Sequence, residues 1–446
     1  MGRRKINLLV VFLAAALLLV CGCLRVSADD LYSLPQVSEG YLRLQAQINS
    51  ILARGADFSP PTGGQNRQAV QQKDLNGDGV NEVLAFFSVP SEGTLRLCIF
   101  EMIDGDYAIA EVIEGVGTAF ESVRYSDMDG DGVLEIIVGW QMGSTLKLLT
   151  IYTIKEFRAV LLLREEYSEL AVFDLTGDGN DDVISIRLPM QDFGAVAQLY
   201  TLMSDGEIVS SEARLSVGIE ALARILTGKL IDNVPAVFVE SEGRYDDGVL
   251  VTDVFAIQNG VFTNISLISA SGISENTVRS PSIYSADIEK DGVIRTPIPR
   301  LLKAQSETPY YVNDWYTYSS DGQILLSLTT YHNSFDEWYL ILPFDWRGRV
   351  SVRRENIVSG ERTVIFSYIA GEDGPYEDFL KIHRLTGDFG EERGKLSGRV
   401  TLLSEGVSTF AFELLAAPNS FGLSFDEDLI KASFRLIYSD WLVGIT

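Results

Sequence analysis

Three short acidic segments of similar sequence hold the residues of this chain best suited to chemistry. Each carries oxygen-bearing side chains at loop positions 1, 3, 5 and 9 and glycine at positions 4 and 6. Ca²⁺ takes several oxygen ligands at once, and glycine lets the backbone turn sharply enough to direct a carbonyl inward from position 7. We therefore predict three calcium sites, with these ligands: Asp74, Asn76, Asp78, Val80 and Glu82; Asp127, Asp129, Asp131, Val133 and Glu135; Asp174, Thr176, Asp178, Asn180 and Asp182.

Asp, Asn and Gly also form ordinary turns, so solvated hairpin turns are the alternative interpretation. Three near-identical copies in one chain favour calcium loops over turns alone. The residues after each loop, 83–87, 136–140 and 183–187, are apolar, β-branched and aromatic, which is typical of strands. An EF-hand would continue into a helix, so the sequence predicts modules in which a calcium loop enters a strand.

A D-x-D-x-D-G-x-x-D loop entering a strand resembles the FG-GAP/VCBS repeat, which is found in the integrin-α-type β-propeller. The resemblance extends over about residues 65–304 and is specific in the loops and weaker between them. It implies radially arranged four-stranded blades with Ca²⁺ held in the hairpin loops of several of them. It implies no enzymatic activity.

The three loops begin 53 and 47 residues apart, at residues 74, 127 and 174, and a period near fifty is typical of a propeller blade. Two weaker copies follow, giving about five blade-like units. The copy at Asp232 has lost its ligands, and the copy at Asp287 carries Arg295 at position 9. We expect the Arg295 guanidinium to take the place of the cation and this loop to be metal-free. Residues 213–227 have apolar spacing that also fits an inserted helix.

The N-terminal 23 residues have the order of a secretory signal, with Arg3, Arg4 and Lys5 before an apolar run. The run ends in a sequence similar to a bacterial lipobox, which predicts lipidation of Cys23 and an extracytoplasmic, membrane-anchored protein. Cleavage after Ala28, giving a secreted protein, and an uncleaved anchor are the alternatives.

The chain is strongly acidic, with 62 Asp and Glu against 36 Lys and Arg and a net charge of −26. A phosphate backbone requires a basic face, so we expect no nucleic-acid partner. An acidic surface suits cation binding. Apart from Cys21 and Cys23 in the signal region the only cysteine is Cys98, so no disulfide framework is possible, and Cys98 is expected to be buried on a strand.

Four segments follow from these patterns: a signal peptide (1–23), a linker and N-terminal helix (24–64), the propeller-like repeats (65–304) and a C-terminal antiparallel α+β domain (305–446). The helix is expected to begin at Ser38 and stop before Gly55. In the last segment six strand-like runs precede a helix through residues 424–437, opened by a capping box at Ser424. Completion of a seven-bladed propeller by this segment is the alternative.

Catalysis finds little support, because nucleophile and phosphate-loop motifs are missing and the two histidines, His332 and His383, stand alone. We therefore expect no catalytic residues, and a calcium-binding module that acts in binding, adhesion or sensing toward an extracellular protein or a glycan. Aromatic residues crowd into 310–318, as either a binding patch or an interface core. A surface hydrolase with its site in residues 305–446 and an accessory scaffold of an envelope complex are the alternative functions.

Overall fold

The computed structural model describes residues 39–155, 158–188, 194–243, 249–280, 283–303, 308–371 and 374–438. The predicted signal peptide and Cys23 lie outside these residues. Within them, no helix combines the length and the apolar character that a membrane crossing requires.

The described chain is mainly β, in six antiparallel sheets that follow one another in sequence, none of which closes into a barrel. The first three sheets consist of β1 (Asp57–Phe58), β2 (Val70–Lys73), β3 (Glu82–Val89), β4 (Thr94–Ile103) and β5 (Asp106–Val116); β6 (Ala119–Ser126), β7 (Glu135–Gln141), β8 (Lys147–Lys155) and β9 (Arg158–Tyr167); and β10 (Glu169–Phe173), β11 (Asp182–Arg187), β12 (Val196–Leu202) and β13 (Ile208–Arg214).

The other three sheets include two five-stranded ones, in the second of which β26 lies between β24 and β25. They consist of β14 (Ile219–Lys229), β15 (Pro235–Gly243), β16 (Leu250–Gln258) and β17 (Val261–Asn264); β18 (Thr296–Leu301), β19 (Tyr311–Tyr318), β20 (Ile324–Asn333), β21 (Trp338–Leu342) and β27 (Phe434–Leu436); and β22 (Val350–Val358), β23 (Glu361–Ile369), β24 (Tyr376–Thr386), β25 (Arg399–Glu405) and β26 (Ser408–Leu414).

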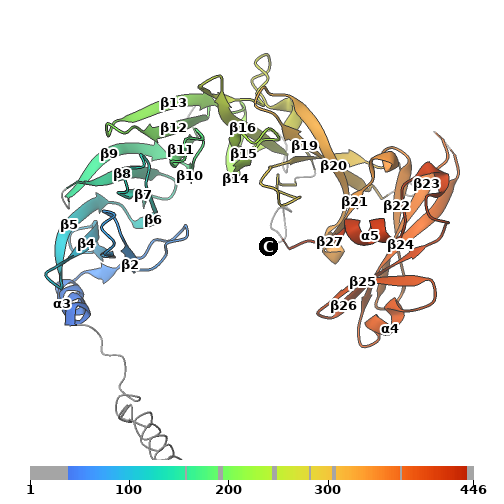
Figure 1. Ribbon diagram of the computed structural model, residues 1–446, viewed down its shortest axis with the longest axis horizontal. Coiled ribbons are helices and arrows are strands. Elements are labelled where there is room, and N and C mark those ends of the chain that lie inside the picture. Colours follow the sequence, from blue (N-terminus) through green and yellow to red (C-terminus); the bar gives the residue numbers. More distant parts are fainter. Residues whose placement is uncertain are drawn as a thin grey trace, which may run out of the picture.

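The six sheets are arranged along an open arc (Figure 1). A hydrophobic core lies between each sheet and the next one along the chain. In β3, Leu84 and Phe86 face the second sheet, while Val83, Ala85 and Phe87 pack on the opposite face. Because both faces are covered, such strands read as continuous apolar runs and not as an alternating pattern.

The outer face of the first sheet is covered by the helix α3 (Glu39–Ala53). Leu44 of this helix is buried against Val83, Phe100 and Tyr107. Beyond the helix, Gly55 has a positive φ of 94°, the left-handed conformation that commonly ends a helix. The predicted helix is confirmed from residue 39, and its expected first residue, Ser38, lies outside the described residues.

An inserted helix over residues 213–227 is wrong, because this segment contains the end of β13 and most of β14. β14 pairs with β15 with two shifts of register, between Ile219 and Ala221 and between Leu222 and Arg224. Each irregularity changes which face the following side chains occupy. The alternation of a strand is therefore broken here into spacings that resemble those of a helix.

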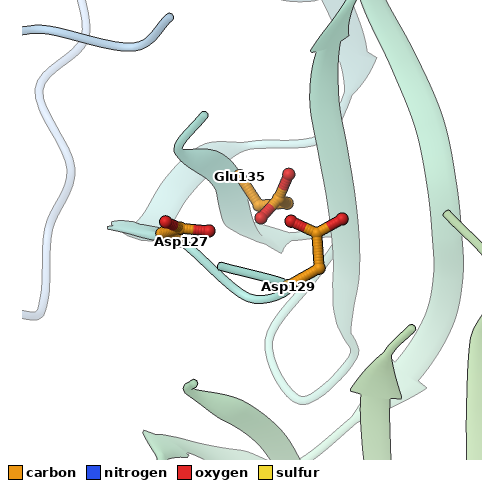
Figure 2. A group of neighbouring side chains, drawn as sticks. All are labelled: Asp127, Asp129 and Glu135. Atoms are coloured by element: carbon orange, nitrogen blue, oxygen red, sulfur yellow. The ribbon is translucent and has the colours of Figure 1, made fainter. Parts of the chain in front are cut away.

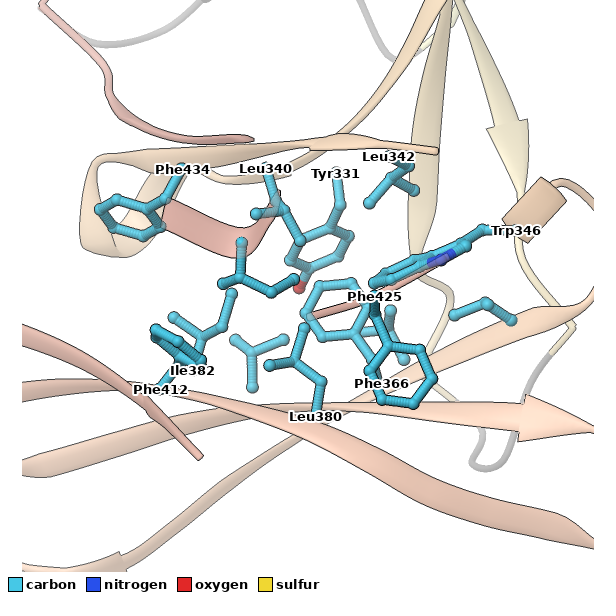
Figure 3. Packing of buried hydrophobic residues seen from close by; sticks show 14 of the residues in the cluster. Tyr331, Leu340, Leu342, Trp346, Phe366, Leu380, Ile382, Phe412, Phe425 and Phe434 are labelled. Carbon is cyan, nitrogen blue, oxygen red and sulfur yellow. The ribbon is translucent and has the colours of Figure 1, made fainter. Parts of the chain in front are cut away.

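The six strand-like runs predicted after residue 337 are confirmed as β21 to β26. The predicted division between residues 304 and 305 passes through the fifth sheet, because β18 pairs with β19 along its whole length. The core between the fifth and sixth sheets is rich in aromatic residues, among them Tyr331, Trp346 and Phe366 (Figure 3). Two short helices lie beside these sheets, α4 (Gly390–Gly394) and α5 (Glu427–Ser433), and four 3-10 turns cover Glu275–Thr277, Ser334–Asp336, Phe344–Trp346 and Ser420–Gly422.

The terminal helix is shorter than predicted. Its cap is Asp426, whose side chain accepts from the Leu429 amide at 2.8 Å, whereas Ser424 donates its amide and hydroxyl to Asp345. Helix α5 ends at Ser433, and the residues from Phe434 pair with β21. The edge of β21 thus pairs with residues that the sequence pattern assigns to the helix.

Candidate metal centres

Each of the three predicted loops connects two consecutive strands of one sheet. The strands are β2 and β3 for the first loop, β6 and β7 for the second, and β10 and β11 for the third. The residue at position 2 anchors each loop in the hydrophobic interior. These residues are Leu75, Met128 and Leu175, each 1% exposed. Oxygen-bearing side chains are thereby held at the same end of three successive sheets.

The loops share a set of hydrogen bonds that close them around their carboxylates. The position-1 aspartate accepts from the position-6 glycine amide at 2.9, 3.0 and 3.0 Å in loops one to three. The position-5 aspartate accepts from the position-7 amide at 2.7, 2.8 and 2.9 Å. The glycines at positions 4 and 6 all have a positive φ, a conformation that glycine adopts at little steric cost. Ordinary turns make the same hydrogen bonds, so these bonds do not distinguish a turn from a metal site. The burial and charge of the carboxylates must do so.

The position-9 acids, Glu82, Glu135 and Asp182, are buried at 4, 1 and 1% exposure. Each accepts from the position-2 amide of its own loop, at 2.7, 2.9 and 3.0 Å. Burial raises the pKa of all three, and raises that of Glu135 to about 7. Buried carboxylates are costly unless a cation or hydrogen bonds compensate them.

The second loop has the most carboxylates at the ligand positions. Ligand oxygens of Asp127, Asp129 and Glu135 lie within 4.8 Å of one another (Figure 2). An all-oxygen set of this kind suits a hard divalent cation such as Ca²⁺ or Mg²⁺. The acids alone do not select between these ions.

The first and third loops have Asn76 and Thr176 at position 3, and so one carboxylate fewer at the ligand positions. In the first loop Asn76 donates to Asp78 at 3.2 Å. One buried oxygen of Asp74, Oδ1, has no hydrogen-bond partner among the described residues. An acceptor of this kind is available to a cation.

A fourth loop of the same geometry lies before β18. Asp287 accepts from the Gly292 amide at 2.8 Å and Asp291 from the Val293 amide at 3.0 Å, the bonds that close the other three loops. The Arg295 guanidinium here contacts Glu289 at 2.6 Å and Asp291 at 2.7 Å and lies 4.0 Å from Asp287. Its hydrogen bonds lower the pKa of Asp291.

The predicted role of Arg295 as an internal counter-charge is confirmed by these contacts. The side chain is 3% exposed, so its charge is withdrawn from water into the loop. The copy at Asp232 does not form such a site: its carboxylate instead accepts from the amide and hydroxyl of Ser320, at 2.9 and 2.7 Å.

Successive loops touch. The Leu134 amide of the second loop donates to the Leu75 carbonyl of the first at 2.8 Å. Ser126, just before the second loop, donates to Asp181 of the third at 2.6 Å. The three loops thus form one continuous acidic row across three sheets.

Sequence reasoning missed the residues that approach the loops from the strand following β3, β7 or β11. Thr201 donates to Asp182 at 2.5 Å, and Thr153 hydrogen-bonds Glu135. In the first sheet Glu101 follows Phe100, the cross-strand partner of Val83, and burial together with Asp78 raises its pKa. Strand register alone brings these residues to the loops, and no local motif marks them.

The two histidines lie within strands, His332 on β20 and His383 on β24. Burial lowers the pKa of His332 to about 3 and that of His383 to about 4, so both are neutral at pH 7. Cys98 lies on β4 as expected, buried at 3% exposure, and burial raises the pKa of its thiol to about 11.

Three of the five aromatic residues at 310–318 belong to separate cores, and Tyr311 is 37% exposed, so these residues do not form one patch. Tyr310 packs against the core between the fifth and sixth sheets, Tyr318 belongs to the core between the fourth and fifth, and Trp315 to a third cluster. Trp315 and Tyr318 are 0 and 1% exposed. The interface interpretation is therefore the one that the structure supports.

No family model and no curated protein matches this chain. A GDP-Man-dependent mannosyltransferase from Leishmania mexicana matches in structure with a TM-score of 0.22 and 8% identity, over 69% of this chain and 90% of that one. A similarity of this size supports no inference about fold family or activity.

Proposed function

We propose that this protein is a calcium-stabilised, extracytoplasmic binding module of the β-propeller type, held at the membrane by a lipid on Cys23 and without enzymatic activity of its own. Six antiparallel sheets with one core between each successive pair support the propeller-type arrangement. The resemblance of the loops to FG-GAP/VCBS repeats points the same way.

The observation that carries the calcium proposal is the contrast between the fourth loop and the first three. The fourth loop compensates its acids with Arg295, whereas loops one to three place an acid at that position. Ten carboxylates occupy ligand positions in those three loops: Asp74, Asp78, Glu82, Asp127, Asp129, Asp131, Glu135, Asp174, Asp178 and Asp182. Three Ca²⁺ ions would offset six of these charges at the positions that the guanidinium fills in the fourth loop.

Calcium in this protein would act by stabilising structure. The ions would tie together the acidic row that joins the first three sheets, and an ion that binds only the folded state adds stability by mass action. A location outside the cytoplasm supplies free Ca²⁺ for sites of modest affinity.

Metal analysis of the purified chain tests the proposal directly. After dialysis against calcium and then buffer, we expect about three bound calcium ions per chain, one for each complete oxygen-ligand loop. Magnesium in equal excess should not displace them. Absence of stoichiometric metal would refute the calcium proposal. For the anchor, labelling with a fatty acid should mark the wild-type chain in cells and leave Cys23→Ala unlabelled.

A further inference from the structure

A cleft of about 220 Å³ opens between the first and second sheets. Its walls come from both sheets: Thr94 and Glu114 from β4 and β5, and Trp140, Tyr152 and Leu161 from β7, β8 and β9. None of these residues belongs to the calcium loops. Ligand sites in proteins are typically concave, with apolar walls and a few polar groups that converge.

The inner wall of the cleft is held by a hydrogen bond and by close packing. The Trp140 indole donates to the Thr150 hydroxyl at 2.7 Å and is 2% exposed. Its ring lies so close to Gly115 that a Cβ there would be 2.3 Å from it. Glycine at this position is therefore required for the ring to lie against the strand.

Three hydroxyl groups line the cleft. The hydroxyl of Thr94 is buried and finds no hydrogen-bond partner in the part of the chain that the structure describes. The Tyr152 hydroxyl hydrogen-bonds Thr150, and burial raises the pKa of Tyr152, so it is a neutral donor at pH 7. An unpaired buried hydroxyl is costly, and a ligand with its own hydroxyl groups would satisfy it.

The charges at the rim balance. Glu114 is exposed and accepts from Arg96 at 2.7 Å, and Arg164 stands on the opposite side of the cleft on β9. One acidic and one basic side chain favour neither an anion nor a cation. Leu161, 48% exposed, adds an apolar lip.

We propose that this cleft binds a neutral saccharide unit. The apolar walls suit the C–H face of a sugar ring, and the hydroxyls of Thr94 and Tyr152, with Glu114 and Arg164 at the rim, suit its hydroxyl groups. The inference deepens the proposed function by naming the class of partner. It rests on that function only for the location of the protein, because its residues take no part in metal binding.

Saturation-transfer NMR and calorimetry on the calcium-loaded full chain test the site. The probes are glucose, mannose, galactose, N-acetylglucosamine and their β-linked disaccharides, with glucose 6-phosphate and inorganic phosphate as charged probes. We expect one or more of the neutral sugars to bind. Leu161→Arg, which blocks the mouth, should weaken that binding at least tenfold.

Val209→Arg is the matched control, because Val209 occupies an equally exposed position (52%) on the outer strand of the third sheet. It should bind sugar like the wild type. Thr94→Val keeps the side-chain shape and should weaken binding several-fold, which keeps the test valid if Leu161→Arg folds poorly. The proposal is overturned if no neutral sugar binds, if only the charged probes bind, or if Leu161→Arg and Thr94→Val bind like the control. Calcium content measured on the same samples reports separately on the proposed function.

Discussion

Replacing Arg295 by glutamate should convert the fourth loop into a calcium site. Arg295→Glu supplies the position-9 acid that the other loops have, while Asp287, Glu289 and Asp291 already occupy positions 1, 3 and 5. The backbone hydrogen bonds of this loop match those of the other three. The variant therefore needs no new loop conformation to bind a cation.

The cost of the change without calcium follows from the contacts of Arg295. Its partner carboxylates are 31, 44 and 45% exposed, so each ion pair is screened by water. We expect a loss of about 1–3 kcal/mol in chelator, since exposed pairs contribute at most about 1 kcal/mol each and a new like charge adds repulsion. Calcium at about 100 times its Kd would add about 2.7 kcal/mol to the stability of the folded variant.

Urea unfolding followed by tryptophan fluorescence measures the loss of stability in chelator and its recovery in calcium. Arg295→Gln is the control, because it removes the counter-charge without supplying the fourth acid, and calcium should rescue it less. Metal analysis should find one more calcium ion in Arg295→Glu than in the wild type. If the variant takes up no additional ion and calcium leaves its unfolding midpoint unchanged, Arg295 does not mark the position of a cation.

Three further outcomes follow from the loops. Chelation should lower the melting temperature of the wild type, and in calcium Asp129→Ala should lower it more than Glu289→Ala; equal shifts in scanning calorimetry would contradict this. The pKa of Glu135 is raised from 4.5 to about 7 in the folded chain, so the stability of the metal-free fold should fall as the pH rises from 4.5 to 7. The calcium affinity measured by calorimetry should fall below pH 7, because protons then compete with the ion for this carboxylate. In urea unfolding, Gly77→Ala should lower the stability of the protein by about 1–3 kcal/mol more than Gly79→Ala. Both glycines have a positive φ, but only a Cβ at Gly77 would clash, because it would lie 2.6 Å from the backbone of the second loop.

The sequence alone determined the features that depend on neighbouring residues. The loops close on themselves through bonds spanning two to seven residues, so Asp74 to Glu82 reads as a loop wherever it occurs. The counter-charge of Arg295 is equally local, because its main partner Asp291 lies four residues away. Helix α3 and the strands β21 to β26 also follow from local periodicity and turn residues.

Tertiary structure decided the features that depend on pairing between distant segments. The bulges of β14 exist only against β15, and the last residues after α5 became a strand because β21 offered an edge. The stacking of the sheets placed Tyr310, Trp315 and Tyr318 in three different cores. The inter-sheet cleft joins Thr94 to Leu161 across 67 positions, and no pattern within either strand indicates it. Such contacts depend on register and sheet packing, which local residue preferences do not encode.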